Sequence, residues 1–251
     1  RQLQMCIRDS LVISADASLP LIYLTGQIKE NPSTAPNFCM LLRKHIGNAR
    51  ILSVTQPNFE RIVEMQLEHL DEMGDLCQKK LIVEIMGKHS NIIFTDADGT
   101  IIDSIKHISH QVSSVREVLP GRTYVYPPAQ EKENPLDIDI NYFMNHVLRK
   151  PVSVTKAIYT SLTGLSPVIA NEICYRAGVD GGMSTAGLSM QEQEDLYAAF
   201  DAMRTSIKEE QFAPCIAYQG YAPKEFAACT LTMYGEEADN LPKKDVDGLK
   251  V

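Results

Sequence analysis

Short apolar runs separated by polar and turn-forming residues fill the first half of the chain. The runs LVIS and LIYLT, within residues 11–25, flank Pro20 and predict two strands. Four further segments between residues 49 and 110 have strand character: ARILSVTQ, ERIVEMQLEHL, KKLIVEIM and NIIFTDADGTIIDSIKHIS. The last segment predicts a hairpin with a two-residue loop at Asp98-Gly99, because both residues tolerate positive φ. We therefore expect a meander of five strands.

A helical pattern lies between the two groups of strands. Pro36 suits a first helical turn, because its missing N–H would have no partner there. Apolar residues then recur at helical spacing at positions 38, 41, 42 and 46, and Gly47-Asn48 supplies a stop. One helix is therefore expected before the meander.

The pattern becomes helical after a proline-rich stretch. Residues 119–136, LPGRTYVYPPAQEKENPL, predict an extended linker, with a domain boundary near Pro135. Four helical segments follow: IDINYFMNHVLR, VTKAIYTSLTGL, SPVIANEICYRAG and SMQEQEDLYAAFDAMRTSIKEE. Ser189 and Glu192 have the spacing of a capping box at the start of the last helix. The segments CIAYQG and ACTLTMY then predict two strands.

These elements predict an α+β chain in three parts. Residues 11–134 are expected to form a β-rich domain, residues 135–212 a helical domain, and residues 213–235 a β-hairpin that returns to the first domain. Residues 1–10 and 236–251 have no periodic apolar pattern, and we expect them to be disordered or non-native. The chain also lacks a Met at position 1, which suggests a truncated protein.

Composition and charge narrow the function classes. No apolar segment approaches the ~20 residues that a membrane span needs, and no signal peptide is visible. We expect a cytoplasmic protein without membrane contact. The formal net charge of −8 confines any nucleic-acid contact to a local basic patch. The cysteines form no CxxC pair and are expected to be reduced thiols: Cys6, Cys39, Cys77, Cys174, Cys215 and Cys229.

The polar stretch 84–94, EIMGKHSNIIF, is a candidate for chemistry. A phosphate-binding P-loop would need Gly at position 82 and Ser or Thr at position 89, where Ile82 and His89 stand. His107 and His110 are spaced as a weak metal-binding pair, near further candidate ligands: His89, Asp96, Asp98 and Asp103. No nucleophile motif occurs. We expect no catalytic residue, no metal and no cofactor, and by local physics a polar turn between strands.

Two binding candidates remain open from the residues alone. Glu60-Arg61, at a strand entrance, is either a solvated surface pair or a pair that reads a base edge and a phosphate. Residues 162–173, LTGLSPVIANEI, indicate a helix-hairpin-helix with its turn at Gly164 and Ser166 as N-cap. Such a turn directs free amides at a phosphate, although an ordinary helical hairpin has the same pattern.

Six segments together closely resemble the N-terminal half of the NFACT family: PNFCMLLRKHI, QPNFERIVEMQ, LIVEIMGKHSNIIF, IIDSIKHIS, SSVREVLPGRTYVYPP and LTGLSPVIANEI. They keep the family order over residues 11–234. The resemblance implies an NFACT-N domain related in fold to the N-terminal domain of formamidopyrimidine-DNA glycosylase, followed by a helix-hairpin-helix domain. It also implies a member truncated at both ends, since the family's coiled coil and NFACT-R domain would come next.

The resemblance implies an adaptor without bond chemistry of its own. Family members bind the large ribosomal subunit that carries a stalled peptidyl-tRNA and recruit tRNA-Ala, so that the ribosome adds untemplated alanines. No small-molecule substrate is implied. The tRNA contacts that the resemblance implies are Glu60, Arg61, Glu84, Ile85, Met86 and Lys88. Position 60 has Glu where many members have Asp.

Two alternatives of other classes stay open. One is a surface adhesin for fibronectin, suggested by an older name of the family, although no export signal is visible. The other is a DNA glycosylase-like lyase, suggested by the helix-hairpin-helix. Those glycosylases use an N-terminal proline and a zinc finger, and this chain shows neither.

Overall fold

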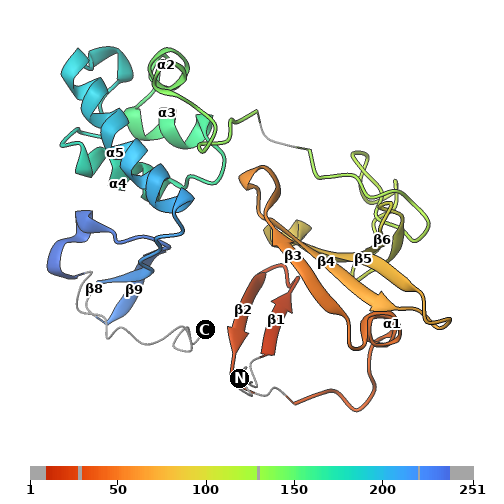
Figure 1. Ribbon diagram of the computed structural model, residues 1–251. Coiled ribbons are helices and arrows are strands. Elements are labelled where there is room, and N and C mark those ends of the chain that lie inside the picture. The colour runs from red at the N-terminus through yellow and green to blue at the C-terminus, as the bar shows by residue number, and fades with distance from the viewer. Residues whose placement is uncertain (1–9, 28–29, 129–130, 220, 238–251) are drawn as a thin grey trace, which may run out of the picture. The chain divides into compact units, whose positions relative to one another are not determined.

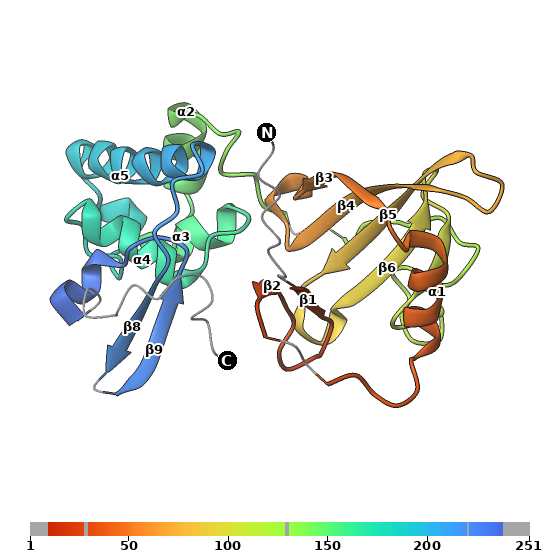
Figure 2. The ribbon, with the colours of Figure 1, turned by 60° about the horizontal axis from the view of Figure 1, so that its bottom comes forward.

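The computed structural model describes residues 10–27, 30–128, 131–219 and 221–237 (Figures 1 and 2). The chain divides into two compact units, with the boundary between residues 128 and 129. The first unit is β-rich and the second is mainly helical. The expected irregular ends, 1–10 and 236–251, lie outside the described residues except at positions 10, 236 and 237.

A five-stranded antiparallel meander forms the first unit, as the pattern predicts. The strand order is sequential, and Figure 1 shows neighbouring strands side by side. The strands are β3 (Arg50–Thr55), β4 (Ile62–Leu70), β5 (Leu76–Glu84), β6 (Asn91–Asp96) and β7 (Ile101–Ser104). Alternation of side chains gives this sheet two apolar faces.

One face of the sheet is covered by a helix and a separate hairpin. Helix α1 (Asn37–Ile46) follows Pro36, and Asn48 takes positive φ just after it, which confirms the predicted helix. Strands β1 (Ser10–Ser14) and β2 (Leu21–Thr25) pair with each other, as predicted. Both elements pack on Met65, Leu67 and Phe94 of the sheet.

The opposite face is covered by the segment that follows β7. Val118 and Tyr124 pack there on isoleucines of the sheet, and the Tyr124 N–H donates to the Gly99 carbonyl at 2.8 Å. Residues 119–128 were expected to be a linker, but they belong to the first unit. Burial of these two side chains turns the proline-rich stretch into a layer of the fold. The boundary therefore lies nearer the N-terminus than the expected position at Pro135.

The β6–β7 turn differs from the expected two-residue loop. The Asp96 N–H donates to the Thr100 carbonyl, which encloses a three-residue loop, and only Gly99 takes positive φ, at 88°. The Asp98 carboxylate instead accepts from the Thr100 backbone N–H at 3.0 Å. A three-residue loop of this kind ends in a bulge, and the β6–β7 register shifts at Thr95 accordingly.

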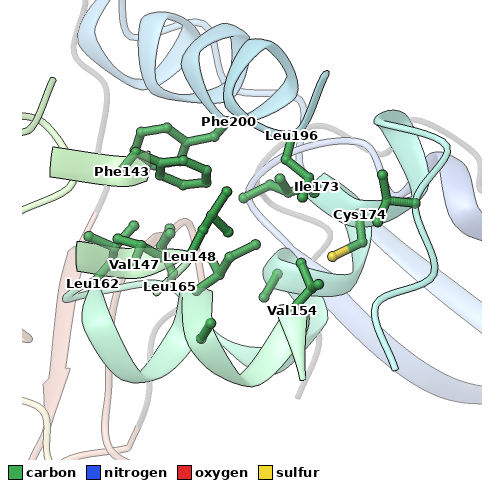
Figure 3. Close-up of a cluster of buried hydrophobic side chains, with 14 of the residues drawn as sticks. Phe143, Val147, Leu148, Val154, Leu162, Leu165, Ile173, Cys174, Leu196 and Phe200 are labelled. Carbon is green, nitrogen blue, oxygen red and sulfur yellow. The ribbon is translucent and has the colours of Figure 1, made fainter. Parts of the chain in front are cut away.

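Helices build the second unit around one apolar core (Figure 3). They are α2 (Ile140–Tyr142) with a π-helical continuation η3 (Phe143–Val147), α3 (Val154–Ser161), α4 (Pro167–Arg176) and α5 (Met190–Lys208). Phe143 stacks on Phe200 with ring centroids 5.0 Å apart. Ser189 and Glu192 make both hydrogen bonds of the predicted capping box.

A two-stranded hairpin closes the described chain. Strand β8 (Cys215–Gln219) is as expected, but its partner β9 (Ala222–Ala227) precedes the predicted segment 228–234. That segment instead enters a 3-10 turn, η5 (Thr232–Glu237), because buried Glu172 of α4 binds its first amides. The hairpin belongs to the same unit as the helices. This differs from the expectation that residues 213–235 return to the first domain.

Candidate nucleic-acid interface

Two polar motifs that are distant in sequence meet at one end of the meander. Ile62 of β4 is paired with Glu84 of β5. One step beyond this pair, the Ile85 N–H donates to the Arg61 carbonyl at 2.9 Å. Glu60-Arg61 therefore lies beside the loop that runs from Ile85 to Ser90. Five of the six predicted contact residues are exposed or half-buried here, and the sixth, Glu84, is buried.

The turn before β4 presents Glu60-Arg61. In η1 (Pro57–Phe59), Asn58 and Phe59 both take positive φ, a conformation that is unfavourable for a bulky side chain such as Phe59. The turn is closed by the Glu60 N–H, which donates to the Pro57 carbonyl at 3.0 Å. Gln56 Nε2 adds a bond to the Glu60 carbonyl at 2.8 Å. Strained backbone of this kind persists where the surroundings fix it, and it is frequent at binding sites.

The side chains of this pair are open to an external partner. Arg61 is exposed and Glu60 is half-buried. Within the ranges that the structure describes, neither side chain forms an ion pair or a hydrogen bond. The planar guanidinium thus retains its donors for an anionic group such as a phosphate.

The adjoining loop has a rigid base and an exposed tip. Its 3-10 turn, η2 (Gly87–His89), begins at Gly87, whose φ is 57°. The buried Ser90 hydroxyl accepts from the Met86 N–H at 2.8 Å and so closes the loop. Lys88 at the tip is exposed, whereas Ile85 and Met86 are half-buried. The loop offers an exposed cation beside partly exposed apolar surface.

Asn91 fixes the far side of this loop. Its side chain is fully buried, its Oδ1 accepts from the Lys106 N–H at 3.0 Å, and its Nδ2 donates to the Lys106 carbonyl at 2.9 Å. Lys106 Nζ in turn donates to the Ala15 carbonyl at 2.5 Å. The β1–β2 turn and the end of β7 are therefore tied to the loop, a role of Asn91 and Lys106 that the sequence analysis missed. A polar Asn at the head of an apolar strand was the available signal.

Glu84 does not present its carboxylate to solvent. The residue is 0% exposed, and both carboxylate oxygens are occupied. Arg116 donates to Oε1 from Nη1 at 2.8 Å and to Oε2 from Nη2 at 2.5 Å, and the Tyr124 hydroxyl donates to Oε1 at 2.9 Å. The expectation that Glu84 touches tRNA directly is therefore corrected. Burial against a partner that is distant in sequence is its physical reason.

The surroundings of Glu84 shift the pKa of both side chains that donate to it. Burial opposes the charge of Arg116, but the hydrogen bond and the negative charge of Glu84 outweigh it and raise the guanidinium pKa. Burial, followed by the charge of Glu84, also raises the pKa of the Tyr124 hydroxyl. Both side chains consequently remain protonated donors to the carboxylate at neutral pH.

The second candidate lies in the other unit. Gly164 takes φ of 74° between α3 and α4, and the Ser166 hydroxyl accepts from the Ile169 N–H at 3.3 Å. Pro167 occupies the first turn, so the predicted cap of α4 is confirmed. Gly164 and Ser166 are both exposed. Binding of a phosphate at this turn stays a prediction.

The two histidines of the candidate metal pair each lie beside a single carboxylate. His107 Nε2 lies 2.6 Å from the Asp103 carboxylate, and His110 Nε2 lies 3.5 Å from Glu117. Across the described residues, no group of three or more His, Cys, Asp or Glu is placed to hold a metal ion. Five cysteines are free thiols, and Cys6 lies outside the described residues. In the same part of the chain, no helix combines the length and apolarity of a membrane span.

Comparison with protein families and curated proteins gives consistent matches. The family model described as NFACT N-terminal and middle domains matches residues 2–246. The Rqc2 homolog RqcH of Bacillus subtilis (strain 168) is 39% identical over 209 residues, which are 83% of this chain and 35% of that protein. The Rqc2 homolog RqcH of Streptococcus pneumoniae serotype 2 is 39% identical over 219 residues, 86% of this chain and 36% of that protein. The chain thus spans about a third of the length of these relatives.

Solved structures share the fold. The fibrinogen binding protein from Staphylococcus aureus superposes with a TM-score of 0.72 at 26% identity, over 90% of this chain and 76% of that one. The N-terminal part of the fibronectin/fibrinogen-binding protein from Streptococcus suis gives a TM-score of 0.73 at 29% identity, over 94% of this chain and 79% of that one.

Proposed function

Because the chain belongs to the NFACT family, we propose that it acts in ribosome-associated quality control as an adaptor that binds tRNA. The relatives at 39% identity are named Rqc2 homolog RqcH, and this supports such a role. In this proposal the protein binds the large ribosomal subunit with its stalled peptidyl-tRNA in the cytoplasm. It recruits tRNA-Ala for C-terminal alanine tailing, and peptide transfer stays with the ribosome.

One observation carries the proposal: the convergence of Glu60-Arg61 with the loop of Lys88 at one end of the sheet. The bond between the Ile85 N–H and the Arg61 carbonyl, at 2.9 Å, fixes the two motifs beside each other. Arg61 and Lys88, both exposed, then lie on adjoining segments at this end of the sheet. This is the local basic patch that nucleic-acid binding requires of an acidic chain.

Each exposed side chain has a distinct part in the proposed contact. The Arg61 guanidinium binds a backbone phosphate through two parallel N–H donors. Glu60 accepts from an amino group at a base edge. Lys88 supplies a point charge to the phosphate backbone, and half-buried Ile85 and Met86 pack against a base or ribose. The turn with Gly164 and Ser166, between α3 and α4, offers a second phosphate contact.

Filter binding of the chain to tRNA-Ala tests this proposal, with Arg61→Ala as the first variant. Loss of a charged hydrogen bond is expected to weaken binding by about 1.5–3 kcal/mol, or about ten- to hundredfold. Since Arg61 is exposed and without a side-chain partner in the described ranges, the unfolding midpoint should not change.

Arg50→Ala is the matched control. Arg50 is also exposed on the meander, but it pairs with Glu68 near the other end of β4. Glu68 lies six positions from Ile62, the neighbour of Arg61, in a strand that rises ~3.3 Å per residue. Wild-type affinity is expected for this control. Equal tRNA affinity of Arg61→Ala and wild type would remove Arg61 from the contact.

Binding of fibronectin or fibrinogen is a second candidate function. It is favoured by the names of two solved structures of the same fold, a fibrinogen binding protein and a fibronectin/fibrinogen-binding protein. Surface plasmon resonance of the chain over immobilised fibronectin and fibrinogen tests it, with tRNA-Ala as competitor. Saturable binding that tRNA leaves unaffected would support this second function. The lyase alternative stays a prediction that borohydride trapping on abasic DNA would test.

A further inference from the structure

Glu84 is fully buried beneath the proposed interface of Arg61 and the loop 85–90, so it can affect this interface only indirectly. It is the last residue of β5, and the loop of the proposed interface begins at the next position. Its backbone is paired with Ile62 on one side and with Asn91 on the other. Any displacement of Glu84 therefore moves the first residue of the loop relative to Arg61.

The side chain of Glu84 is held by two residues that follow β7. Arg116, whose side chain is 11% exposed, makes two parallel bonds to the carboxylate and a third to the Val125 carbonyl at 2.8 Å. The Tyr124 hydroxyl adds a third hydrogen bond to the carboxylate, and the Arg116 guanidinium carbon lies 5.9 Å from the centroid of the Tyr124 ring. Segment 116–125 is thereby clamped to the end of β5.

A buried ion pair of this kind is weak evidence for stability. Apolar residues of similar volume at such a position commonly leave stability unchanged or raise it, whereas removal of one partner leaves an uncompensated buried charge. The fixed geometry of two parallel bonds offers specificity of position instead. That position is the base of the loop with Lys88 at its tip.

We propose that Arg116 and Tyr124 are positioning residues for tRNA binding, which act through Glu84 to set the loop 85–90 beside Arg61. This inference rests on the proposed function. It assigns the effect of Glu84 on tRNA to the shape of the loop and not to a contact with the nucleic acid.

Paired apolar replacement separates these two roles. Glu84→Met and Arg116→Met each leave one charge of the buried pair without its partner, and each is expected to weaken tRNA-Ala binding about tenfold, as when an orienting outer residue is lost. The triple variant Glu84→Met/Arg116→Met/Tyr124→Phe removes the buried carboxylate together with both side chains that donate to it. Recovery to within about twofold of wild type is expected, because the apolar side chains again fix the end of β5.

A contact role for Glu84 would give a different result. The triple variant would then bind as weakly as Glu84→Met, and this outcome overturns the inference. Wild-type affinity of Arg116→Met would overturn it as well. If the wild-type chain does not bind tRNA-Ala, the proposed function fails; if the wild-type chain binds tRNA-Ala but the triple variant does not recover, only the positioning role fails.

Tyr124→Phe replaces the single Met variants as the test of the positioning role if one of them folds poorly. This variant removes one hydroxyl and leaves the ion pair of Glu84 with Arg116. Hydrogen exchange of the Met86 amide, which is bonded to Ser90 Oγ, reports the loop without tRNA. Faster exchange of the Met86 amide in Tyr124→Phe than in wild type, with unchanged exchange at Met65 in the middle of β4, supports the inference. Wild-type exchange at Met86 contradicts it.

Discussion

Charge and burial divide the residues of the proposed interface into two groups. Arg61 and Lys88 are exposed cations, whereas Glu84 is fully buried with all its partners inside the fold. Both groups are required by the account, the first to bind phosphates and the second to hold the binding groups in place. Substitutions in the two groups should therefore differ in how salt affects the outcome.

Lys88→Ala should change the salt dependence of tRNA binding. A lysine that neutralises one phosphate adds about 0.7–0.9 to the slope of log K against log salt, so the variant's slope should be shallower by that amount. Filter binding to tRNA-Ala between low and physiological salt measures the slope. Lys44→Ala, an exposed lysine of α1 paired with Glu72, is the control and should keep the wild-type slope. An unchanged slope in Lys88→Ala would exclude a phosphate contact at this position.

Sequence alone identified these residues but could not assign them to the two groups. Glu60, Arg61 and Lys88 were selected through the resemblance to a family, and they are accessible in the structure. Glu84 was selected in the same way, but its burial depends on Arg116, 32 positions later in the chain. Local pattern contains no information on a partner at that separation.

At the level of elements, short-range patterns predicted most strands and helices. The meander, α1, α4 and α5 follow from apolar periodicity and caps that lie within each element. Two of the differences from the predicted elements, at residues 119–128 and 228–234, concern segments fixed by tertiary partners. Val118 and Tyr124 draw the first onto the sheet, and Glu172 converts the second into a turn.

The attachment of the C-terminal turn to α4 depends on Glu172. This buried carboxylate accepts from Arg176 Nε at 2.7 Å, from the Thr232 hydroxyl at 2.6 Å, and from two backbone N–H groups of η5. Burial acts to raise the pKa of Glu172, but these hydrogen bonds outweigh it and hold the pKa below its ordinary value of 4.5.

Glu172→Gln should release this turn and alter its response to acid. A folded-state pKa below the unfolded one contributes stability that is complete above pH 4.5 and lost as the pH falls through the folded value. We expect the free energy of opening this turn to be lower by about 3 kcal/mol than in wild type at pH 7. As the pH falls further, this free energy should decrease less in the variant than in wild type. Hydrogen exchange of the Thr232 and Met233 amides, compared with wild type at each pH, measures both.

Glu194→Gln is the control for this element. Glu194 is exposed on α5, and its substitution should leave exchange at Thr232 unchanged. If the Thr232 and Met233 amides of Glu172→Gln keep wild-type protection at pH 7, Glu172 does not attach η5 to α4.

The whole chain is acidic, with a net charge of −8, and yet the proposed function is to bind tRNA. Attraction over the whole surface cannot supply that affinity, so a small site of fixed geometry must. The end of the meander is such a site, because backbone pairing, Asn91 and the Glu84 group fix its three sides. The sequence predicted the strands of this sheet, but the meeting of its two motifs emerges only from the register of β4 and β5.

Site-specific photocrosslinking to tRNA-Ala tests this central claim most directly. A benzoylphenylalanine replaces Lys88 at the proposed interface in one variant and Gln78, exposed near the opposite end of β5, in another. If this end of the meander binds tRNA, position 88 gives a covalent tRNA adduct and position 78 gives none. Arg61→Ala should then reduce the adduct from position 88. An adduct from position 78 alone, or equal adducts from both positions, would contradict it.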